Sequence, residues 1–542
     1  MASTKMLSVA LDFGTSCSGY AFSFQHDKET ISTSRWAGSD YIKAPTSILF
    51  NPQKEFDSFG FEAENKFADL SKTGSHQDWY LFKQFKLVLI KENKLSRSTV
   101  INDVSGKKML AMDVFSSAIK VLKDNIMKDL RGQSTPILNS DIQWVLTVPA
   151  IWDDAAKQFM RFAANQAGIP NESLMLVLEP DAAAMSASCS SMFAEGEKCM
   201  ILDCGGGTID VSVMKKNSRG SVDCIYRPTG GVWGGTKVDD AFQEFLIAHF
   251  GMDRFLRMEM NEVLQVQRSF ETAKKKAQEP GVMKAGIWLP LTLRKDIDQL
   301  PIKQNIIGDK LNLNVGQVVS FFQKPVSSIV AHLQKIMTEL EVDRLKYIIM
   351  VGGFSESTIL QSEIQNNFPS IDVLVVEDPC SAVLKGAVVL GHNPKVIESK
   401  RSAYTYGIKV MTNFIEKYHD KSKLMVIDGE TNCKDVFDKV MGINETMKIN
   451  ETKVEKIYGP AYFGQRSCVL SIYKSKNVNP CYVTDPGCEQ IGDLVVDMPD
   501  LTGEKNRQVA VTTYFGETEL RAEAVDKTTG RKYTASFEFL GY

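Results

Sequence analysis

One pattern occurs twice in this chain, as Leu11-Asp12-Phe13-Gly14-Thr15-Ser16 and as Leu202-Asp203-Cys204-Gly205-Gly206-Gly207-Thr208. Each copy lies between two apolar runs, and this arrangement predicts two strands joined by a glycine-rich turn. Glycine lets the backbone come close to a phosphate, and the N–H groups of the turn can form an anion-binding concavity. Neighbouring threonine and serine hydroxyls add further donors. Two such hairpins that face each other predict a site that holds phosphates from both sides.

An aspartate ends the first strand of each hairpin, Asp12 in one and Asp203 in the other. A carboxylate repels phosphate, but it can hold Mg²⁺, which prefers oxygen ligands and usually keeps several of its waters. We therefore expect Asp12 and Asp203 to hold Mg²⁺ through water. The site is not a P-loop, because the chain contains no G-x-x-x-x-G-K-[ST] sequence.

Strands and helices are predicted to alternate as far as residue 392, which is typical of an α/β fold. Apolar residues at helical spacing predict helices near 154–167, 238–250 and 318–340. After Pro394 the helical spacing weakens, and short strand-like runs follow one another. We expect an α/β domain over residues 1–394, a polar linker over 395–404 and a β-sandwich-like domain over 405–542.

Composition excludes several classes of protein. The chain has 63 basic and 66 acidic residues, a net charge of −3, so it lacks the basic excess typical of nucleic-acid binding. No apolar run approaches the roughly 18–20 residues that span a bilayer. The ten cysteines include no C-x-x-C pair, which favours free thiols in a reducing compartment over a disulfide framework. We expect a cytoplasmic protein, with the nucleus as the alternative, that binds no nucleic acid and has no transmembrane segment.

The two hairpins resemble the phosphate motifs of the actin-like ATPase superfamily, and further segments resemble the 70-kilodalton heat-shock protein family in particular. Residues 436–453 and 491–530 are similar to the peptide-binding β domain of that family. Residues 401–407 and 433–437 are most similar to its atypical heat shock 70 kDa protein 12 branch. The family-like segments occur in family order as Leu146-Thr-Val-Pro-Ala150, Leu178-Glu-Pro-Asp-Ala-Ala-Ala184, Phe270-Glu-Thr-Ala-Lys-Lys-Lys276, Val351-Gly-Gly-Phe-Ser355 and Glu377-Asp-Pro-Cys-Ser-Ala382.

This resemblance implies an actin-like ATPase fold, with two RNase H-like lobes around a nucleotide cleft, followed by a β-rich peptide-binding-like domain. It implies ATP or ADP with Mg²⁺ as ligands, and unfolded or extended polypeptides as partners. The phosphates would contact Gly14, Thr15, Ser16, Gly205, Gly206, Gly207 and Thr208, with a further turn at Gly234 and Gly235. The adenosine would contact Glu271, Lys274, Lys275, Gly352, Gly353 and Phe354.

The resemblance also implies catalytic roles. Glu179 would order the metal's waters or the attacking water, and Asp210 is a candidate proton acceptor. Asp203, which would hold the metal, and Thr208, which would hold phosphate, also count as catalytic residues. A family lysine that positions the attacking water maps to Lys83, with Lys86 as the competing assignment. Little other chemistry is needed, because phosphoryl transfer relies mainly on positioning and charge neutralisation.

Three features depart from the family pattern. The segment Phe354-Ser355-Glu356 has no counterpart of the arginine that stacks on the base, so adenine binding should be weaker or differently built. The predicted linker is polar rather than leucine-rich, which puts communication between the domains in doubt. The sequence given stops at Tyr542, just after the β domain, so no helical lid is expected.

The leading hypothesis is therefore a stress-response chaperone that hydrolyses ATP slowly with Mg²⁺ and binds polypeptides. The alternative is a nucleotide-sensing adaptor or scaffold with little or no ATPase activity. A small-molecule kinase of the same superfamily is disfavoured, because the C-terminal domain resembles that of the chaperones.

Overall fold

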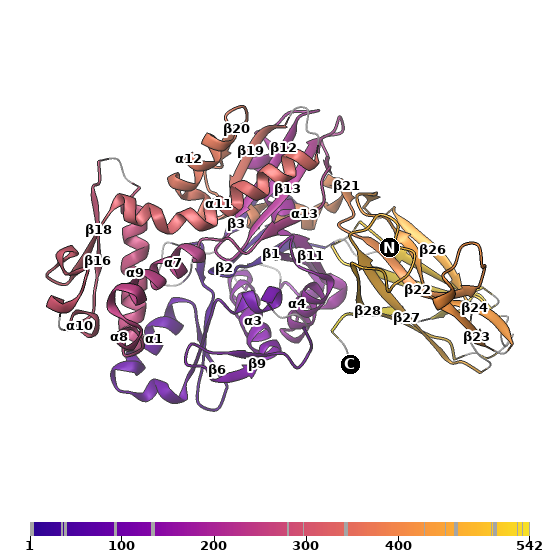
Figure 1. The fold of residues 1–542 in the computed structure, drawn as a ribbon, viewed down its shortest axis with the longest axis horizontal. Helices are drawn as coiled ribbons and strands as arrows, with labels where there is room; N and C mark the ends of the chain where they lie inside the picture. Colours follow the sequence, from indigo (N-terminus) through magenta and orange to yellow (C-terminus); the bar gives the residue numbers. More distant parts are fainter. Residues whose placement is uncertain are drawn as a thin grey trace.

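Two unequal parts make up the molecule in this computed structural model, a broad N-terminal part and a narrower C-terminal part coloured orange to yellow (Figure 1). The structure describes residues 5–33, 36, 41–91, 95–131, 136–278, 281–295, 297–340, 345–427, 429–449, 451–459, 464–499, 501, 507–516, 518–527, 529–533 and 535–540.

The first sheet of the broad part has the strand order β11-β10-β1-β2-β3, with the short β4 paired to β2. β1 is buried along its whole length, because β10 pairs with it in parallel on one side and β2 pairs antiparallel on the other. Helices α3 (Ala111–Leu130) and α4 (Asp154–Gln166) pack on this sheet through a shared apolar core. The strands are β1 (Leu7–Phe13), β2 (Cys17–Phe24), β3 (Asp27–Thr33), β4 (Lys43–Pro45), β10 (Ile142–Val148) and β11 (Leu174–Leu178).

The second sheet repeats this topology in the order β20-β19-β12-β13-β14. β12 and β13 form an antiparallel hairpin, and β19 runs parallel to β12, as β10 does to β1. The two glycine-rich hairpins therefore occupy equivalent places in two sheets of the same order. The strands are β12 (Lys198–Cys204), β13 (Ile209–Lys216), β14 (Val222–Cys224), β19 (Leu345–Val351) and β20 (Asp372–Val375), with β15 (Thr229–Gly231) paired to β13.

Two helices fill the space between the sheets. α5 (Glu179–Met185) follows β11, and α13 (Ala382–His392) follows β20. Both helices share one apolar core with residues of both sheets, among them Ala10 of β1 and Ile201 of β12. This core fixes the two hairpins relative to each other.

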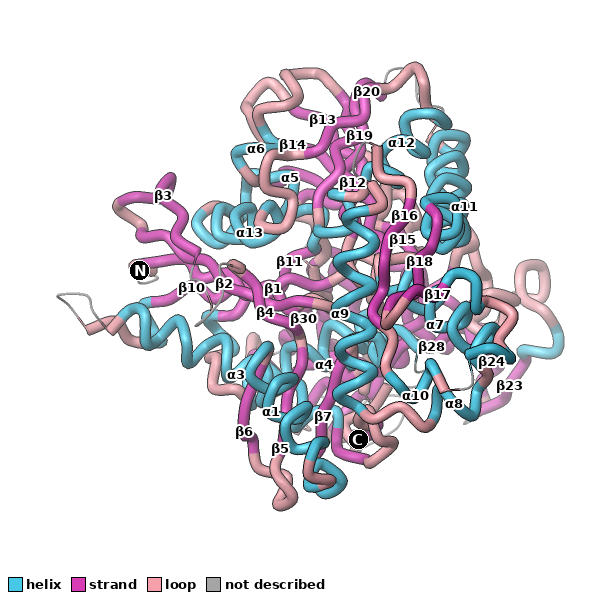
Figure 2. Tube along the Cα trace, turned by 90° about the vertical axis from the view of Figure 1, so that its left-hand side faces the viewer, coloured by secondary structure: helices cyan, strands magenta, loops and turns pink. Residues whose placement is uncertain are grey.

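Smaller elements extend each half. On the first half, α1 (Phe61–Lys72) packs beside β5 (Ser47–Phe50), β6 (Phe56–Phe59) and β7 (Tyr80–Lys83). On the second, α7 (Thr236–Phe250), α9 (Met260–Lys276) and α11 (Val315–Glu339) share an apolar core with β12 and β13. Figure 2 shows α9 at the front, with α1 on one side of it and α7 on the other.

The narrow part is a β domain of two sheets. The first sheet has the order β23-β24-β22-β27-β28-β32, and the second has the order β26-β29-β30-β31. One apolar core that includes Ile408, Leu494 and Val511 joins the two sheets face to face. The strands are β22 (Thr405–Asn413), β23 (Leu424–Ile427), β24 (Glu430–Met441), β26 (Lys453–Tyr458), β27 (Ser467–Ser475), β28 (Cys488–Asp497), β29 (Val509–Tyr514), β30 (Arg521–Asp526), β31 (Lys532–Tyr533) and β32 (Ala535–Glu538).

The segment expected as a polar linker, 395–404, contains a strand. β21 (Ile397–Arg401) pairs in parallel with β14 and antiparallel with β25 (Thr446–Lys448), so it extends the second sheet. Its polar side chains are partnered inside the protein: Lys400 Nζ lies 2.8 Å from Asp181 Oδ2, and the Ser399 hydroxyl donates to Asp223. The segment is therefore a structural bridge between the two parts rather than a free tether.

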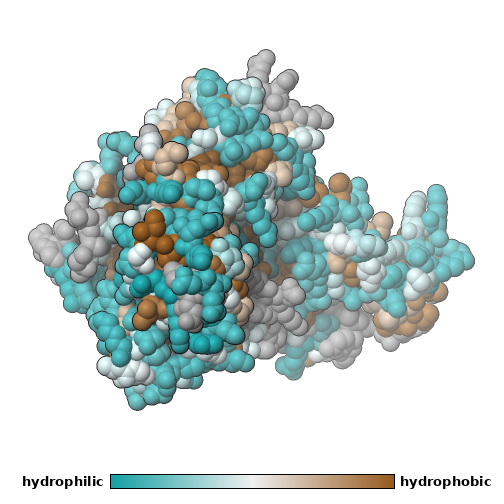
Figure 3. All heavy atoms as spheres, turned by 60° about the vertical axis from the view of Figure 1, so that its left-hand side comes forward, coloured by the Kyte–Doolittle hydropathy of each residue, from teal (hydrophilic) through white to brown (hydrophobic). Residues whose placement is uncertain are grey.

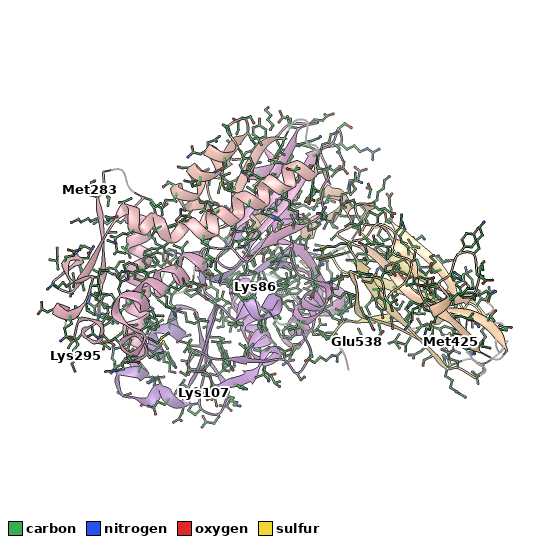
Figure 4. The ribbon with its side chains drawn as sticks, in the orientation of Figure 1. Lys86, Lys107, Met283, Lys295, Met425 and Glu538 are labelled. Atoms are coloured by element: carbon green, nitrogen blue, oxygen red, sulfur yellow. The ribbon has the colours of Figure 1, made fainter. Side chains whose placement is uncertain are left out.

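The β domain also contacts the first half. Arg161 of α4 donates to both carboxylate oxygens of Glu519, and the Gln158 side chain donates to the Phe537 carbonyl and accepts from Phe539 N–H. Leu540 is buried in the core under α3 and α4. Glu538, labelled in Figure 4 at the junction of the two parts, pairs with Arg97 at 2.9 Å.

The expected secondary structure agrees well with these elements. The predicted helices correspond to α4, α7 and α11, and α11 continues through Pro325. Among the described residues, no helix is both long and apolar enough to cross a membrane.

Candidate functional site

The two glycine-rich turns meet at the centre of the broad part. A Cβ atom on Gly206 would collide with Ser16, and one on Gly207 would collide with Thr15, so only glycine allows this approach. The turns border a cavity of about 460 Å³. Predicted site residues that line it are Asp12, Gly14, Thr15, Ser16, Glu179, Asp203, Gly205, Gly206, Gly207, Thr208, Gly235, Glu271, Lys274, Gly352, Gly353 and Phe354.

Four predicted residues, Lys83, Asp210, Gly234 and Lys275, do not line this cavity. Gly234 lies behind the second turn, where its N–H donates to the Gly207 carbonyl. Lys275 lines an adjoining pocket of about 390 Å³. Asp210 lies directly opposite Asp203 in the β12–β13 register, so both carboxylates point to the same face of the sheet.

Both carboxylate oxygens of Asp12 are occupied. Thr147 Oγ1 donates to Oδ1 at 2.9 Å, and Lys43 Nζ donates to Oδ2 at 2.5 Å. Burial alone would raise the pKa of Asp12, but the Lys43 ammonium and these hydrogen bonds hold it below its ordinary value. Asp12 is therefore ionised at neutral pH.

Lys86, rather than Lys83, lies beside Glu179. Lys86 Nζ is 2.7 Å from Glu179 Oε1, the Lys86 side chain is 3% exposed, and the ammonium sits over the Trp152 ring. Lys83 instead pairs with Glu64 at 2.9 Å. Burial raises the pKa of Glu179 to about 7. The Lys86 ammonium lowers this pKa only in part, and the negative charges of Asp210 and Asp12 raise it further.

Asp203 has no such partner. Among the described residues, no donor is hydrogen-bonded to its carboxylate, and its pKa is raised well above the ordinary value by burial and by Glu179, Asp210 and Asp12. Burial likewise raises the pKa of Asp210 to about 6, although hydrogen bonds from Thr208 and from the Ile151 N–H oppose this shift. Negative charge at this end of the cavity is thus under-compensated.

This set of residues fits a divalent cation. Lys43 and Lys86 compensate two of the four carboxylates, those of Asp12 and Glu179, and leave Asp203 and Asp210. Oxygen ligands of this kind suit Mg²⁺, which tolerates carboxylates together with retained waters. The residues present therefore fit the predicted metal.

The opposite end of the cavity is built from α9 and from the turn after β19. Lys274 pairs with Asp239 at 2.6 Å and also with Glu271. Gly352 has φ +80°, and a Cβ there would collide with the Asp203 carboxylate. The Phe354 ring stacks against Phe322, with ring centroids 6.1 Å apart and planes inclined by 27°. The Phe354 ring thus offers a flat aromatic surface at this end of the cavity.

Sequence reasoning missed two polar residues that contact Asp12. Lys43 belongs to no motif, and only the pairing of β4 with β2 brings it to Asp12. Thr147 could have been found, because it lies within the segment Leu146-Thr-Val-Pro-Ala150, which follows the family pattern. The structure thus adds one lysine and one hydroxyl around Asp12.

Comparison with known proteins agrees with this architecture. The family model described as Hsp70 protein matches residues 11–449. The chain is 31% identical to Heat shock 70 kDa protein 12A of Mus musculus, over 99% of this chain and 92% of that protein. It is 30% identical to Heat shock 70 kDa protein 12B of Homo sapiens, over 98% of this chain and 91% of that protein. It is 28% identical to Chaperone protein DnaK of Elusimicrobium minutum, over 45% of this chain and 38% of that protein.

Proposed function

Since the chain belongs to the Hsp70 family and matches its heat shock 70 kDa protein 12 branch, we propose that its cleft binds ATP with Mg²⁺ and hydrolyses it slowly, and that its β domain binds extended polypeptides. The observation that carries the ATPase proposal is the phosphate cradle of two facing turns beside a buried, under-compensated group of carboxylates. Such a site suits an anionic phosphate chain that arrives with a divalent cation.

The residues of the cleft have distinct proposed roles. Backbone N–H groups of Gly205–Thr208, with the Thr15 and Ser16 hydroxyls, would hold the phosphates, while Asp12 and Asp203 would hold Mg²⁺ through water. When bound, the metal neutralises charge that develops on the transferred phosphoryl group. Lys86 takes the role predicted for Lys83, because it adjoins Glu179 in the cavity.

Water activation is proposed for the Lys86–Glu179 pair. Lys86 would present its ammonium to the terminal phosphate, and Glu179 would orient the attacking water. Asp210 is kept as the candidate proton acceptor named from the sequence; because its side chain does not line the cavity, the proton would have to reach it through an intervening group.

The test is single-turnover hydrolysis of ATP by the purified chain with Mg²⁺. Wild type should convert bound ATP to ADP, and Asp203→Asn should bind nucleotide without converting it. Unchanged hydrolysis by Asp203→Asn would overturn the assignment. Tight binding without turnover by the wild type would favour the nucleotide-sensing adaptor. This candidate is supported by the altered adenosine segment, since Phe354-Ser355-Glu356 contains no arginine.

A separate feature supports polypeptide binding. β23 is the edge strand of its sheet, and Leu424, Met425 and Val426 are 44%, 38% and 63% exposed. Figure 3 shows apolar residues at the far end of the narrow part, and Figure 4 labels Met425 there. Charged residues or proline usually prevent a natural edge strand from pairing with another chain, whereas β23 contains neither. An extended peptide could add to this edge as a further strand.

Binding of a fluorescent apolar peptide, followed by anisotropy, tests this site. Val426→Lys should weaken binding about tenfold, or ~1.4 kcal/mol. Val469→Lys is the matched control, because Val469 is also exposed, at 58%, but lies on the interior strand β27 of the same sheet. Equal losses in both variants would contradict β23 as the binding edge.

A further inference from the structure

The contact between Lys43 and Asp12 is built into the first sheet. β4 pairs antiparallel with β2, and this register sets Lys43 against Gly19, which itself pairs with Asp12. A Cβ on Gly19 would come within 2.8 Å of Lys43 Cγ, so this glycine leaves room for the lysine stem. The side chains of Lys43 and Asp12 are 16% and 8% exposed. Backbone pairing of β4 with β2 therefore places the Lys43 ammonium beside Asp12 Oδ2.

That oxygen belongs to a predicted metal ligand. With Lys43 Nζ at 2.5 Å from Asp12 Oδ2, no metal-bound water fits between them, and Oδ1 already accepts from Thr147. We propose that Lys43 is a built-in competitor of the divalent cation: it holds Asp12 in the metal-free cleft, and it must leave Asp12 before a cation can use this oxygen. The proposal rests on the nucleotide site proposed above.

The second half of the proposal concerns the released ammonium. Lys43 lines the same cavity as Thr15, Ser16 and the glycine turn, so a phosphate chain in this cradle offers it a new anionic partner. Without nucleotide, a cation that takes Asp12 leaves Lys43 buried and unpaired, which is unfavourable. With nucleotide, the phosphates compensate the lysine. Metal and nucleotide should therefore bind with positive coupling, and each should raise the affinity of the other by the same factor.

Removal of Lys43 then has opposite effects on two ligands. Metal alone should bind more tightly, because its competitor is gone, whereas the metal–nucleotide pair should bind less tightly, because a phosphate partner is lost. Neither misfolding nor a purely structural role of Lys43 gives this combination, since both would weaken binding of the two ligands alike.

The experiment titrates the purified full chain with Mn²⁺, followed by electron paramagnetic resonance, with and without a non-hydrolysable ATP analogue. Lys43→Met should bind free Mn²⁺ about tenfold more tightly than wild type and the Mn²⁺–nucleotide pair about tenfold more weakly. Lys43→Gln also removes the charge but keeps a polar side chain. It should show the same two changes in affinity, and it replaces Lys43→Met if that variant folds poorly. Lys43→Arg should stay close to wild type in free Mn²⁺ affinity, since it keeps a cation at Asp12.

The control is Lys66→Met. Lys66 lies outside the cavity, where it pairs with Asp57, and its loss removes the same charge from the molecule. Lys66→Met should leave both affinities unchanged. Free Mn²⁺ affinity that is equal or lower in Lys43→Met and Lys43→Gln would overturn the proposal. If wild type failed to bind the Mn²⁺–nucleotide pair at all, the nucleotide site itself would be refuted instead.

Discussion

Lys86 Nζ lies 2.7 Å from Glu179 Oε1, and the two side chains are only 3% and 10% exposed. Lys83, three residues earlier, pairs instead with Glu64. The separation arises at Gln84, whose φ of 52° turns the chain between the end of β7 and the short helical turn that carries Lys86. The cleft lysine is thus selected by the backbone turn rather than by any difference in chemistry between the two residues.

Replacement of Lys86 should slow hydrolysis. We expect Lys86→Met to reduce single-turnover hydrolysis by about 10²–10³, the loss typical of one electrostatic stabiliser. The fold should survive, because the unpaired Glu179 can become neutral by protonation. Lys83→Met should change the rate by less than about threefold, a fraction of 1 kcal/mol. A larger loss in Lys83→Met than in Lys86→Met would restore the assignment made from the sequence.

Asp203→Asn should stabilise the metal-free protein at high pH. The raised pKa of Asp203 means that its ionised form is disfavoured in the fold, so wild type loses stability as the pH rises through that pKa. The asparagine removes this penalty, and we expect it to raise the unfolding temperature by a few degrees at pH 8, with a smaller gain at pH 5. Differential scanning fluorimetry with EDTA measures this. A variant less stable than wild type at pH 8 would contradict the predicted charge repulsion.

Phe354→Ala should weaken nucleotide binding through the base alone. Stacking of a base on an aromatic ring contributes about 1–3 kcal/mol where it has been measured by alanine substitution. The variant should therefore lose about tenfold or more in ATP affinity by isothermal titration calorimetry. Tripolyphosphate, which has no base, is the control ligand and should bind both proteins equally. A parallel loss for tripolyphosphate would show that Phe354 supports the cavity rather than the base.

Much of the fold could be predicted, because its signals are local. The hairpins are marked by apolar strands on both sides of glycine-rich turns. The alternation of strands and helices follows from the spacing of apolar residues as far as α13. The cleft residues of these turns could be predicted for the same reason. Lys43 could not, because its approach to Asp12 depends on strand pairing between segments with no shared motif.

The segment 395–404 shows a second limit. The sequence Ile397-Glu-Ser-Lys-Arg401 is polar, which is typical of an exposed connection, yet Ser399 and Lys400 are buried in β21. Their polar groups are satisfied by Asp223 and Asp181, which lie much earlier in the chain. Burial of a polar strand depends on partners that the local sequence does not reveal.

The Lys400–Asp181 pair leads to the last prediction, because it joins the bridge strand to the helix that begins with Glu179. Lys400→Met should open β21, since removal of one partner from a buried ion pair typically costs about 3–5 kcal/mol. Hydrogen exchange of residues 397–401, followed by mass spectrometry, should become faster by two or more orders of magnitude, at about 1.4 kcal/mol per tenfold. The double variant Lys400→Met/Asp181→Asn should recover part of this protection, because no uncompensated charge then remains.

Arg219→Ala is the control: Arg219 is 80% exposed and pairs with Glu398 of the same strand at 3.7 Å, so its loss should cost about 0–1 kcal/mol. Equal exchange in Lys400→Met and Arg219→Ala would mean that backbone pairing with β14 and β25, rather than the ion pair, holds the bridge in the sheet.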